Sequence, residues 1–254
     1  TGDPFYYSEK IAGEGYPFDN LQDSVIYAAT PLYVAGKSTD GKWWFVISPD
    51  IAGWVHSDNV AFTDDKFIAI WQNAAYRALA GITKNNLSVK DGSGNYLFSA
   101  YVGTLLPLIK SADSDLTVFV PVRNQIRMAE IKTAVLSLDD ISALPIAATT
   151  ANIAKILKVM QGRTYGWGNL DMYNDCSSEL KNIYALFGIY IPRNTKSIDD
   201  AGEVVDLSNK FISERLDYLM QNGIPLLTFV HINGHVVLYV GKYDKSYSKV
   251  GAKL

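Results

Sequence analysis

The apolar and polar positions of the first 145 or so residues predict short β-strands separated by turns. Residues 31–34 and 43–47 are apolar runs on either side of a turn at Asp40-Gly41, and residues 53–55 form a third run. Two aromatic-rich runs joined through Asp-Gly are typical of a β-hairpin. We therefore expect a small antiparallel sheet at the start of the chain.

A similar layout recurs further along. Residues 87–89, a Gly- and Asp-rich turn at 90–95, and the runs 96–98 and 102–107 repeat the same order of elements. This repetition predicts two copies of one small β-barrel, with strands too short for a long sheet. Between the copies, residues 65–79 carry apolar side chains at helical spacing, which predicts a short connector helix.

After about residue 145 the pattern becomes helical. Residues 152–161, 176–187 and 210–221 each predict a helix with one apolar face, and glycines end the first two. Residues 224–230 and 235–240 then predict two buried strands around Asn233-Gly234. Helices followed by antiparallel strands indicate an α+β domain. We therefore expect three domains, at residues 1–80 (with the connector helix), 81–145 and 146–254.

Composition and charge narrow the function classes. With 48% hydrophobic residues among 254, the chain can bury sizeable cores and is not a disordered sequence. A net charge of −3 disfavours a nucleic-acid partner, and the longest apolar runs are too short for a membrane span. One cysteine and three histidines exclude a disulfide framework and a Cys-rich zinc site. We expect a monomer with no metal and no cofactor.

Cys176, the single cysteine, lies at the predicted start of helix 176–187, where Asp175 or Asn174 is suited to cap the helix. Backbone N–H groups at a helix N-terminus favour the thiolate, and such settings lower a thiol pKa from about 8.5 to about 3.5–7.5. The same groups can receive a developing oxyanion. A buried structural cysteine is the alternative. The position after a Gly-rich loop favours a nucleophile.

His235 begins the predicted strand 235–240, directly after Gly234. An imidazole at a strand end is rigidly held and suits a general base, although a hydrogen-bonded hairpin histidine is the alternative. His231 is a weaker candidate, and we interpret His56 as a surface or core histidine. Cys176 and His235 together form the pair that is expected of cysteine hydrolases.

Four ordered motifs add a specific resemblance. They are Arg163-Thr164-Tyr165-Gly166-Trp167-Gly168, Asp175-Cys176-Ser177-Ser178, Ile191-Pro192-Arg193-Asn194-Thr195 and Gly234-His235-Val236-Val237-Leu238-Tyr239-Val240-Gly241. With these motifs the chain resembles the NlpC/p60 cysteine peptidases. Residues 13–19 and 53–55 resemble the first unit of a subgroup with two bacterial SH3-like domains. The resemblance implies a multidomain fold in which two small SH3-like all-β barrels precede an α+β, papain-like NlpC/p60 catalytic domain.

The resemblance also implies catalytic roles. Cys176 matches the nucleophile and His235 the general base. Tyr165 matches an active-site tyrosine whose hydroxyl would hold the oxyanion or the thiolate, with loop packing as the alternative role.

Four further residues match positions that shape the subsite for the stem peptide of the substrate: Asp175, Ser177, Arg193 and Thr195. In the SH3-bearing subgroup a free N-terminal L-alanine amine is commonly recognised, and Asp175 is a plausible charge partner for it. Alternatively, Asp175 is only a helix cap and Arg193 only its ion-pair partner.

The implied activity is cleavage of the amide between γ-D-glutamate and a diamino acid in peptidoglycan stem peptides. The implied location is the cell envelope, either periplasmic or secreted. The first SH3-like unit would form a wall of the cleft and limit the substrate's length. Tyr16, Trp43 and Trp44 are its candidate aromatic residues, with packing in the barrel core as the alternative.

One departure from the family concerns the residue that orients the base. Family members carry a His, Asn or Gln on the strand after the Gly-His strand, whereas none of these follows His235 here. Either the C-terminal strands are missing from this chain, or another residue replaces the orienting one, or activity is impaired. Asp244 would be a replacement, but its surroundings predict a solvated turn.

The sequence leaves two other functions open besides that of a peptidase. A cell-wall binding or scaffold protein would have the same fold with an impaired peptidase domain, which the missing orienting residue favours. An acyltransferase would use the same Cys176 and His235 pair with an amine in place of water.

Overall fold

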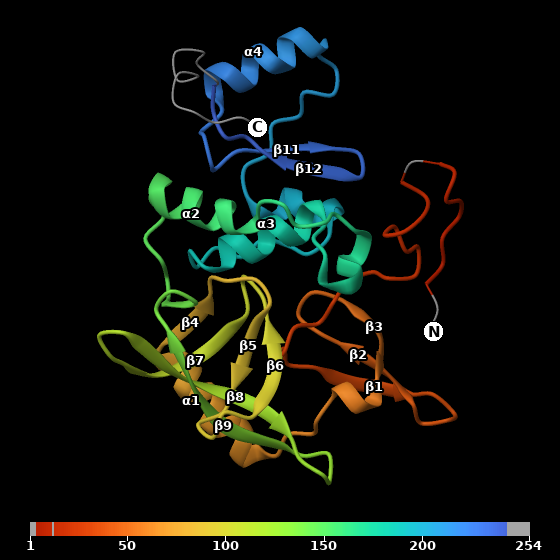
Figure 1. Cartoon of the computed structure of the whole chain (residues 1–254). Helices are drawn as coiled ribbons and strands as arrows, with labels where there is room; N and C mark the ends of the chain where they lie inside the picture. Colours follow the sequence, from red (N-terminus) through yellow and green to blue (C-terminus); the bar gives the residue numbers. More distant parts are fainter. Residues whose placement is uncertain (1–3, 12, 243–254) are drawn as a thin grey trace.

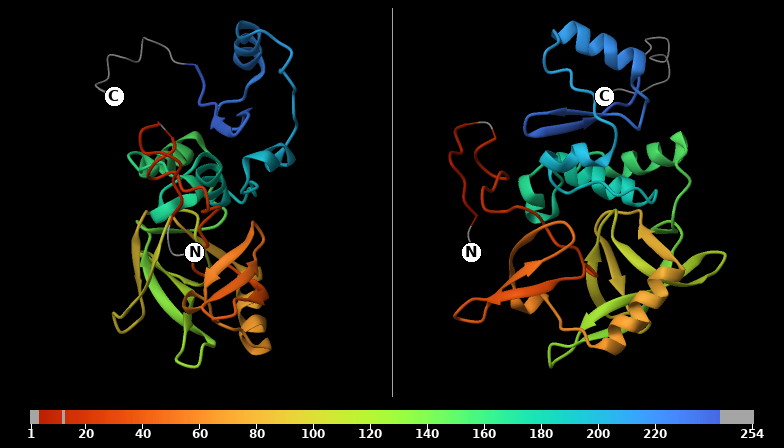
Figure 2. Two further views of the ribbon diagram at one scale, coloured as in Figure 1. Left: turned by 90° about the vertical axis from the view of Figure 1, so that its right-hand side faces the viewer. Right: turned by 180° about the vertical axis from the view of Figure 1, so that it is seen from behind.

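A computed structural model describes residues 4–11 and 13–242 of the chain. Two β units lie side by side beneath a layer of helices, and a further helix with a two-stranded hairpin lies above that layer (Figure 1). The two turned views show the same order of layers (Figure 2).

The first β unit is a three-stranded antiparallel sheet of β1 (Tyr33–Lys37), β2 (Trp43–Ile47) and β3 (Ala52–His56), in that order. It confirms the hairpin predicted from the Asp-Gly turn. Residues of β2 alternate between the two faces, so that Trp44 and Val46 are buried while their neighbours are not. A short 3-10 turn, η1 (Ser57–Asn59), ends the unit.

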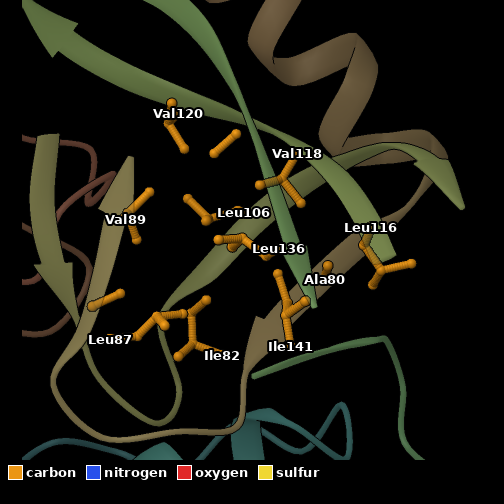
Figure 3. Close-up of a cluster of buried hydrophobic side chains, with 12 residues drawn as sticks. Ala80, Ile82, Leu87, Val89, Leu106, Leu116, Val118, Val120, Leu136 and Ile141 are labelled. Carbon is orange, nitrogen blue, oxygen red and sulfur yellow. The ribbon is translucent and has the colours of Figure 1, made fainter. Parts of the chain in front are cut away.

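The second β unit consists of one larger sheet and one hairpin. Its elements are α1 (Asp65–Arg77), β4 (Leu79–Ile82), β5 (Leu87–Lys90), β6 (Tyr96–Ala100), β7 (Leu105–Ser111), β8 (Asp115–Arg123), β9 (Ala129–Ser137) and β10 (Ile141–Ala143). The larger sheet has the order β10-β4-β7-β8-β9, and β5 pairs with β6. Buried aliphatic side chains from both parts, Leu106 and Val89 among them, form one core (Figure 3).

Two features of this unit differ from the expected pattern. Strands β8 and β9 have nine residues each, longer than the short strands predicted, because Leu116, Val118 and Val120 continue the alternation that buries one face. Helix α1, expected as a connector, packs against β4, β7 and β9 of this second unit. The domain limits near residues 80 and 145 stay predictions.

The remaining elements form the helical layer and the upper hairpin. They are α2 (Thr150–Met160), η2 (Trp167–Met172), α3 (Cys176–Ala185), η3 (Thr195–Ala201), α4 (Ile212–Asn222), β11 (Phe229–Ile232) and β12 (His235–Leu238). Helices α2 and α3 share a core with Val236 of β12. None of the helices in the described ranges is long and apolar enough to cross a membrane.

The expectation of two buried strands is wrong in two respects. The first strand begins only at Phe229, because Pro225 has no N–H to donate, Leu226 has a φ of 65°, and the Ile224 N–H donates to the Thr228 hydroxyl (2.8 Å). In addition, Val236 is the one buried residue of the two strands. Helix α3 packs against β12 of this hairpin.

A glycine lets the second β unit approach the helical layer closely. Gly103 has a φ of 88°, and a Cβ added there would lie 2.7 Å from the Cα and the carbonyl oxygen of Asn182 in α3. The side-chain amide of Asn182 donates to the Tyr27 hydroxyl (3.1 Å), in the segment that leads into β1. Helix α3 is therefore fixed against both β units.

We predict that Gly103→Ala destabilises the protein more than Gly94→Ala. Both glycines have positive φ (88° and 84°), but only Gly103 has atoms within 4 Å of the added Cβ. The backbone strain costs about 1–2 kcal/mol at either position, and the clash at Gly103 adds about 1–3 kcal/mol. Urea denaturation of the two variants measures the difference, and equal losses would contradict a close approach at Gly103.

Candidate active site

Cys176 is the first residue of α3, and its position is fixed by a capping box. Asp175 is the N-cap with extended backbone angles, and its carboxylate accepts a hydrogen bond from the Ser178 N–H (2.9 Å). In return, the Ser178 hydroxyl accepts one from the Asp175 N–H (3.1 Å). The predicted cap is thus confirmed, and the helix-start N–H groups surround the cysteine.

Arg193 holds this cap by a buried ion pair. Its guanidinium donates to both carboxylate oxygens of Asp175, at 2.6 Å and 3.2 Å, and the two residues are only 6% and 8% exposed. The same guanidinium donates to the Ser177 hydroxyl (3.1 Å) and to the Asn169 side-chain oxygen (2.9 Å). Three of the predicted subsite residues therefore lie together, but their polar atoms bond to one another.

Asn169 was not among the residues singled out from the sequence. It is 2% exposed, and its amide donates to the Tyr173 carbonyl and to the Ser178 hydroxyl, both at 2.8 Å. It therefore joins η2 to both the cap and Arg193. The available signal was a polar residue directly after the glycine-rich Gly166-Trp167-Gly168 motif.

The segment before β1 also reaches this network. Arg193 donates through Nε to the Ser24 hydroxyl (2.7 Å) and through Nη2 to the Asp23 carbonyl (3.3 Å). The Gln22 side chain donates to the Gly168 carbonyl (3.2 Å). Gly168 has a φ of 59°, and an added Cβ would overlap the Gln22 backbone, so only glycine fits there. One arginine thus connects segments that are about 150 residues apart in sequence.

Aromatic side chains extend the contact between that segment and the η2 loop. The Tyr16 hydroxyl donates to the Asp171 carboxylate (2.9 Å) and lies 2.8 Å from the Tyr173 hydroxyl. Phe18 packs edge-on against Trp167, with 5.3 Å between ring centroids. The N-terminal segment accordingly rises beside the helical layer (Figures 1 and 2).

The three aromatic candidates for the cleft wall have different environments. Tyr16 lies against the η2 loop, as described above. Trp44 is 3% exposed in the core of the first β unit, and Trp43 packs against His56 at its surface. The contact with the η2 loop therefore comes from residues 16–24, which precede the sheet.

The surroundings of the Cys176 thiol include two predicted residues. Its Sγ lies 3.7 Å from the Thr195 Oγ1. Burial, together with the neighbouring thiol, raises the pKa of Tyr165, so its hydroxyl stays protonated and can donate at neutral pH. The Tyr165 ring also packs edge-on against the His235 imidazole, with 6.3 Å between centroids. Tyr165 therefore contacts both members of the predicted pair.

Cys176 and His235 share no hydrogen bond within the described ranges, and the imidazole has no hydrogen-bond partner there. Catalytic hydrogen bonds often tighten only when substrate is bound, so an open pair is compatible with catalysis. Asp244, the candidate to orient the base, lies outside the described residues.

The other two histidines have carboxylate neighbours. His231 Nδ1 lies 3.0 Å from an Asp199 carboxylate oxygen, and His56 lies 3.7 Å from Asp58 on the first β unit. In residues 4–11 and 13–242 no group of three His, Cys, Asp or Glu side chains is arranged to hold a metal ion.

Comparisons with known proteins agree with this architecture. Residues 4–56 match the family model of an SH3 domain of the SH3b1 type, and residues 64–112 match that of an SH3 domain of the SH3b2 type. No curated protein matches the chain.

Two solved structures are similar to it. One is a novel NlpC/P60 endopeptidase from Photobacterium damselae subsp. piscicida, with a TM-score of 0.82 and 28% identity over 95% of this chain and 54% of that one. The other, an NlpC/P60 family protein from Bacillus cereus ATCC 10987, has a TM-score of 0.54 and 18% identity over 73% of this chain and 62% of that one, which shows the fold alone. The chain thus spans about half the length of the first structure.

These findings confirm the expected fold class of two SH3-like β domains followed by an α+β region. The matches to two SH3 domain models and the similarity to NlpC/P60 structures support an NlpC/p60 protein that carries two SH3 domains at its N-terminal side.

We predict that Arg193→Met lowers the free energy of unfolding by about 3–5 kcal/mol, because it leaves the Asp175 carboxylate buried without a counter-charge. Arg123→Met is the matched control, since Arg123 pairs with the well-exposed Asp58 at 3.5 Å and such a surface pair is worth about 0–1 kcal/mol. Urea denaturation compares the two variants. A loss at position 193 no larger than the control would rule out a structural role for the buried pair.

Proposed function

We propose that the protein is a peptidoglycan hydrolase, and more specifically a cysteine endopeptidase that cleaves between γ-D-glutamate and a diamino acid in stem peptides. The observation that carries the proposal is the position of Cys176 at the N-terminus of α3, with Thr195 and Tyr165 beside its thiol and His235 beside Tyr165. The similarity to an NlpC/P60 endopeptidase structure supports it. The proposed location is the cell envelope, as a monomer.

The proposed chemistry proceeds through a thioester. The Cys176 thiolate attacks the γ-carbonyl carbon, and the helix-start N–H groups and the Tyr165 hydroxyl stabilise the oxyanion. His235 protonates the departing amine as the C–N bond breaks. A water molecule, deprotonated by His235, then attacks the thioester, which releases the γ-D-glutamyl product and restores the thiol.

We further propose that residues 16–24 form the wall that limits the length of the substrate. Tyr16 and Phe18 cover the η2 loop directly beside Tyr165, and Phe18 contacts the Tyr165 ring at 6.4 Å between centroids. The Asp175 carboxylate is already bonded by Arg193 and Ser178, so it supports the wall and the cap. Contact of Asp175 with the N-terminal amine of a substrate stays a prediction.

A catalytically impaired scaffold is the second candidate. The observation that favours it is the lack of a hydrogen-bond partner for His235 among the described residues. The two candidates predict opposite reactivity of the thiol, because a catalytic cysteine is a thiolate near neutral pH and a structural one is not.

We predict that the protein releases L-Ala-D-Glu from L-Ala-γ-D-Glu-diaminopimelate and that Cys176→Ala abolishes this release. Mass spectrometry of the products measures it. No product from the wild-type protein, or equal product from Cys176→Ala, would rule out the proposed activity. Addition of amine acceptors distinguishes hydrolysis from acyl transfer, since a transferase would give the amide of the acceptor.

Alkylation by iodoacetamide provides an independent test, because Cys176 is the only thiol in the chain. We predict faster alkylation of the native protein than of the same protein unfolded in urea, because a nucleophilic thiol at a helix start reacts faster than an ordinary one. Slower labelling of the native protein, together with binding of stem peptides, would favour the scaffold.

We predict that Tyr165→Phe lowers kcat about 10²-fold with little change in KM, since one donor to an oxyanion contributes about that much. The control is Tyr76→Phe, whose side chain is 90% exposed on α1. Steady-state kinetics on the same substrate measures both variants. An unchanged kcat would leave Tyr165 with the role of packing in its loop.

A further inference from the structure

A histidine–carboxylate contact joins the β11–β12 hairpin to η3. The Nδ1 of His231, in β11, lies 3.0 Å from a carboxylate oxygen of Asp199, in η3. Within the described ranges, this is the one hydrogen bond or ion pair between the two elements. Neither residue takes part in the mechanism described above, which leaves this contact without a role.

Among the described residues, little else holds the tip of the hairpin. At its open end, Phe229 packs edge-on against Tyr184 of α3, with 5.3 Å between ring centroids. Toward the tip, Val236 is the one buried residue of the two strands. A cavity of about 330 Å³, lined by Lys196 of η3 and residues 231–234, leaves the tip without close packing at this point. Because few buried contacts hold the tip, its displacement costs little free energy, and a single polar contact matters.

The His231–Asp199 contact lies next to the proposed base along the hairpin. His231 pairs across the hairpin with Val236, and the next pair toward the turn is Ile232 with His235. Residues directly opposite one another lie on the same face of a sheet, so His231 shares the face of Val236, which packs into the core of the helical layer. Displacement of this pair would therefore move the neighbouring His235 with it.

The other end of the contact belongs to an element that reaches Cys176. Asp199 lies in η3, the short element that begins at Thr195. The Thr195 hydroxyl lies 3.7 Å from the Cys176 Sγ. The contact between His231 and Asp199 thus connects the element beside the thiol with the strand pair beside the His235 imidazole, across an interface that is partly open.

We propose that His231 and Asp199 are positioning residues that hold the tip of the hairpin and so keep the His235 imidazole in place beside Tyr165. This inference rests on the proposed function, in which His235 is the base. In the described part of the chain no hydrogen bond joins the two imidazoles, so His231 acts through the strand pair and not on the base directly. His231 therefore supports catalysis without touching the substrate.

Steady-state kinetics of a set of variants tests the proposal. We expect His231→Ala and Asp199→Ala each to lower kcat/KM for L-Ala-γ-D-Glu-diaminopimelate about fivefold, because the base is in place in a smaller fraction of the molecules. The double variant loses no more than either single variant, since both residues act through one contact. His231→Asn retains most of the activity, because its side-chain amide can donate to Asp199 from about the position of the Nδ1 atom.

The matched control is His56→Ala, which removes the 3.7 Å contact of His56 with Asp58 on the first β unit and leaves kcat/KM unchanged. No loss in either single variant would overturn the positioning role. So would losses that multiply in the double variant of His231 and Asp199, or equal losses in His231→Asn and His231→Ala, because the two residues would then act separately.

NMR of the free protein separates a failure of this inference from a failure of the proposed function. The chain has three histidines, so the ring resonances of His235 can be assigned by single substitutions. The Tyr165 ring packs edge-on against this imidazole, with 6.3 Å between centroids, and so shifts its resonances. We expect Asp199→Ala to move these resonances and to speed amide hydrogen exchange in β11 and β12 about fivefold, with exchange in α3 unchanged.

The control variant His56→Ala changes neither the His235 resonances nor the exchange of the hairpin. A protein that shows both changes in Asp199→Ala but cleaves no stem peptide would support the positioning of His235 and refute the proposed activity alone. Unchanged His235 resonances or unchanged exchange of the hairpin in Asp199→Ala would overturn the positioning role, whatever the activity.

Discussion

The buried pair of Arg193 and Asp175 is the interaction on which the rest of the site depends. Asp175 caps the helix that begins with Cys176, so the guanidinium that fixes the carboxylate also fixes the position of Cys176. The same guanidinium bonds Asn169 of the η2 loop and Ser24 of the segment before β1. Burial of two charges is costly unless every donor finds a partner, and here the partners come from three separate segments. The pair therefore requires all three segments to be in place before it stabilises any of them.

Much of the site could be predicted because its chemistry is local in sequence. A cysteine at a helix start and a histidine at a strand start are recognisable from a few neighbouring residues, and both elements begin where expected, at Cys176 and His235. The bonds that surround them are not local. The resemblance named Tyr16, Trp43 and Trp44 of the first SH3-like unit as wall candidates, but it did not show that Tyr16 reaches the η2 loop while Trp44 is buried in the core of the unit. Such contacts depend on how separate units pack, and no short-range pattern encodes that packing.

The same dependence on packing between distant segments explains why some elements differ from those predicted from the sequence. The alternation of apolar and polar residues predicts which face of a strand is apolar. It does not predict how far the pairing with a neighbouring strand extends, so the length of β8 and β9 was missed. Apolar residues after Gly223 predicted a buried strand, but Pro225 and the Thr228 hydroxyl form a turn there instead. Apolar content also overstated burial, since Val236 is the one buried residue of β11 and β12.

The two members of the candidate catalytic pair, Cys176 and His235, differ in how firmly their elements are held. Cys176 begins a helix held by the cap, the buried arginine and the second β unit, so its position is set before any substrate binds. His235 lies on a hairpin in which Val236 alone is buried. Because the hairpin makes few buried contacts, a local displacement of the hairpin costs little free energy.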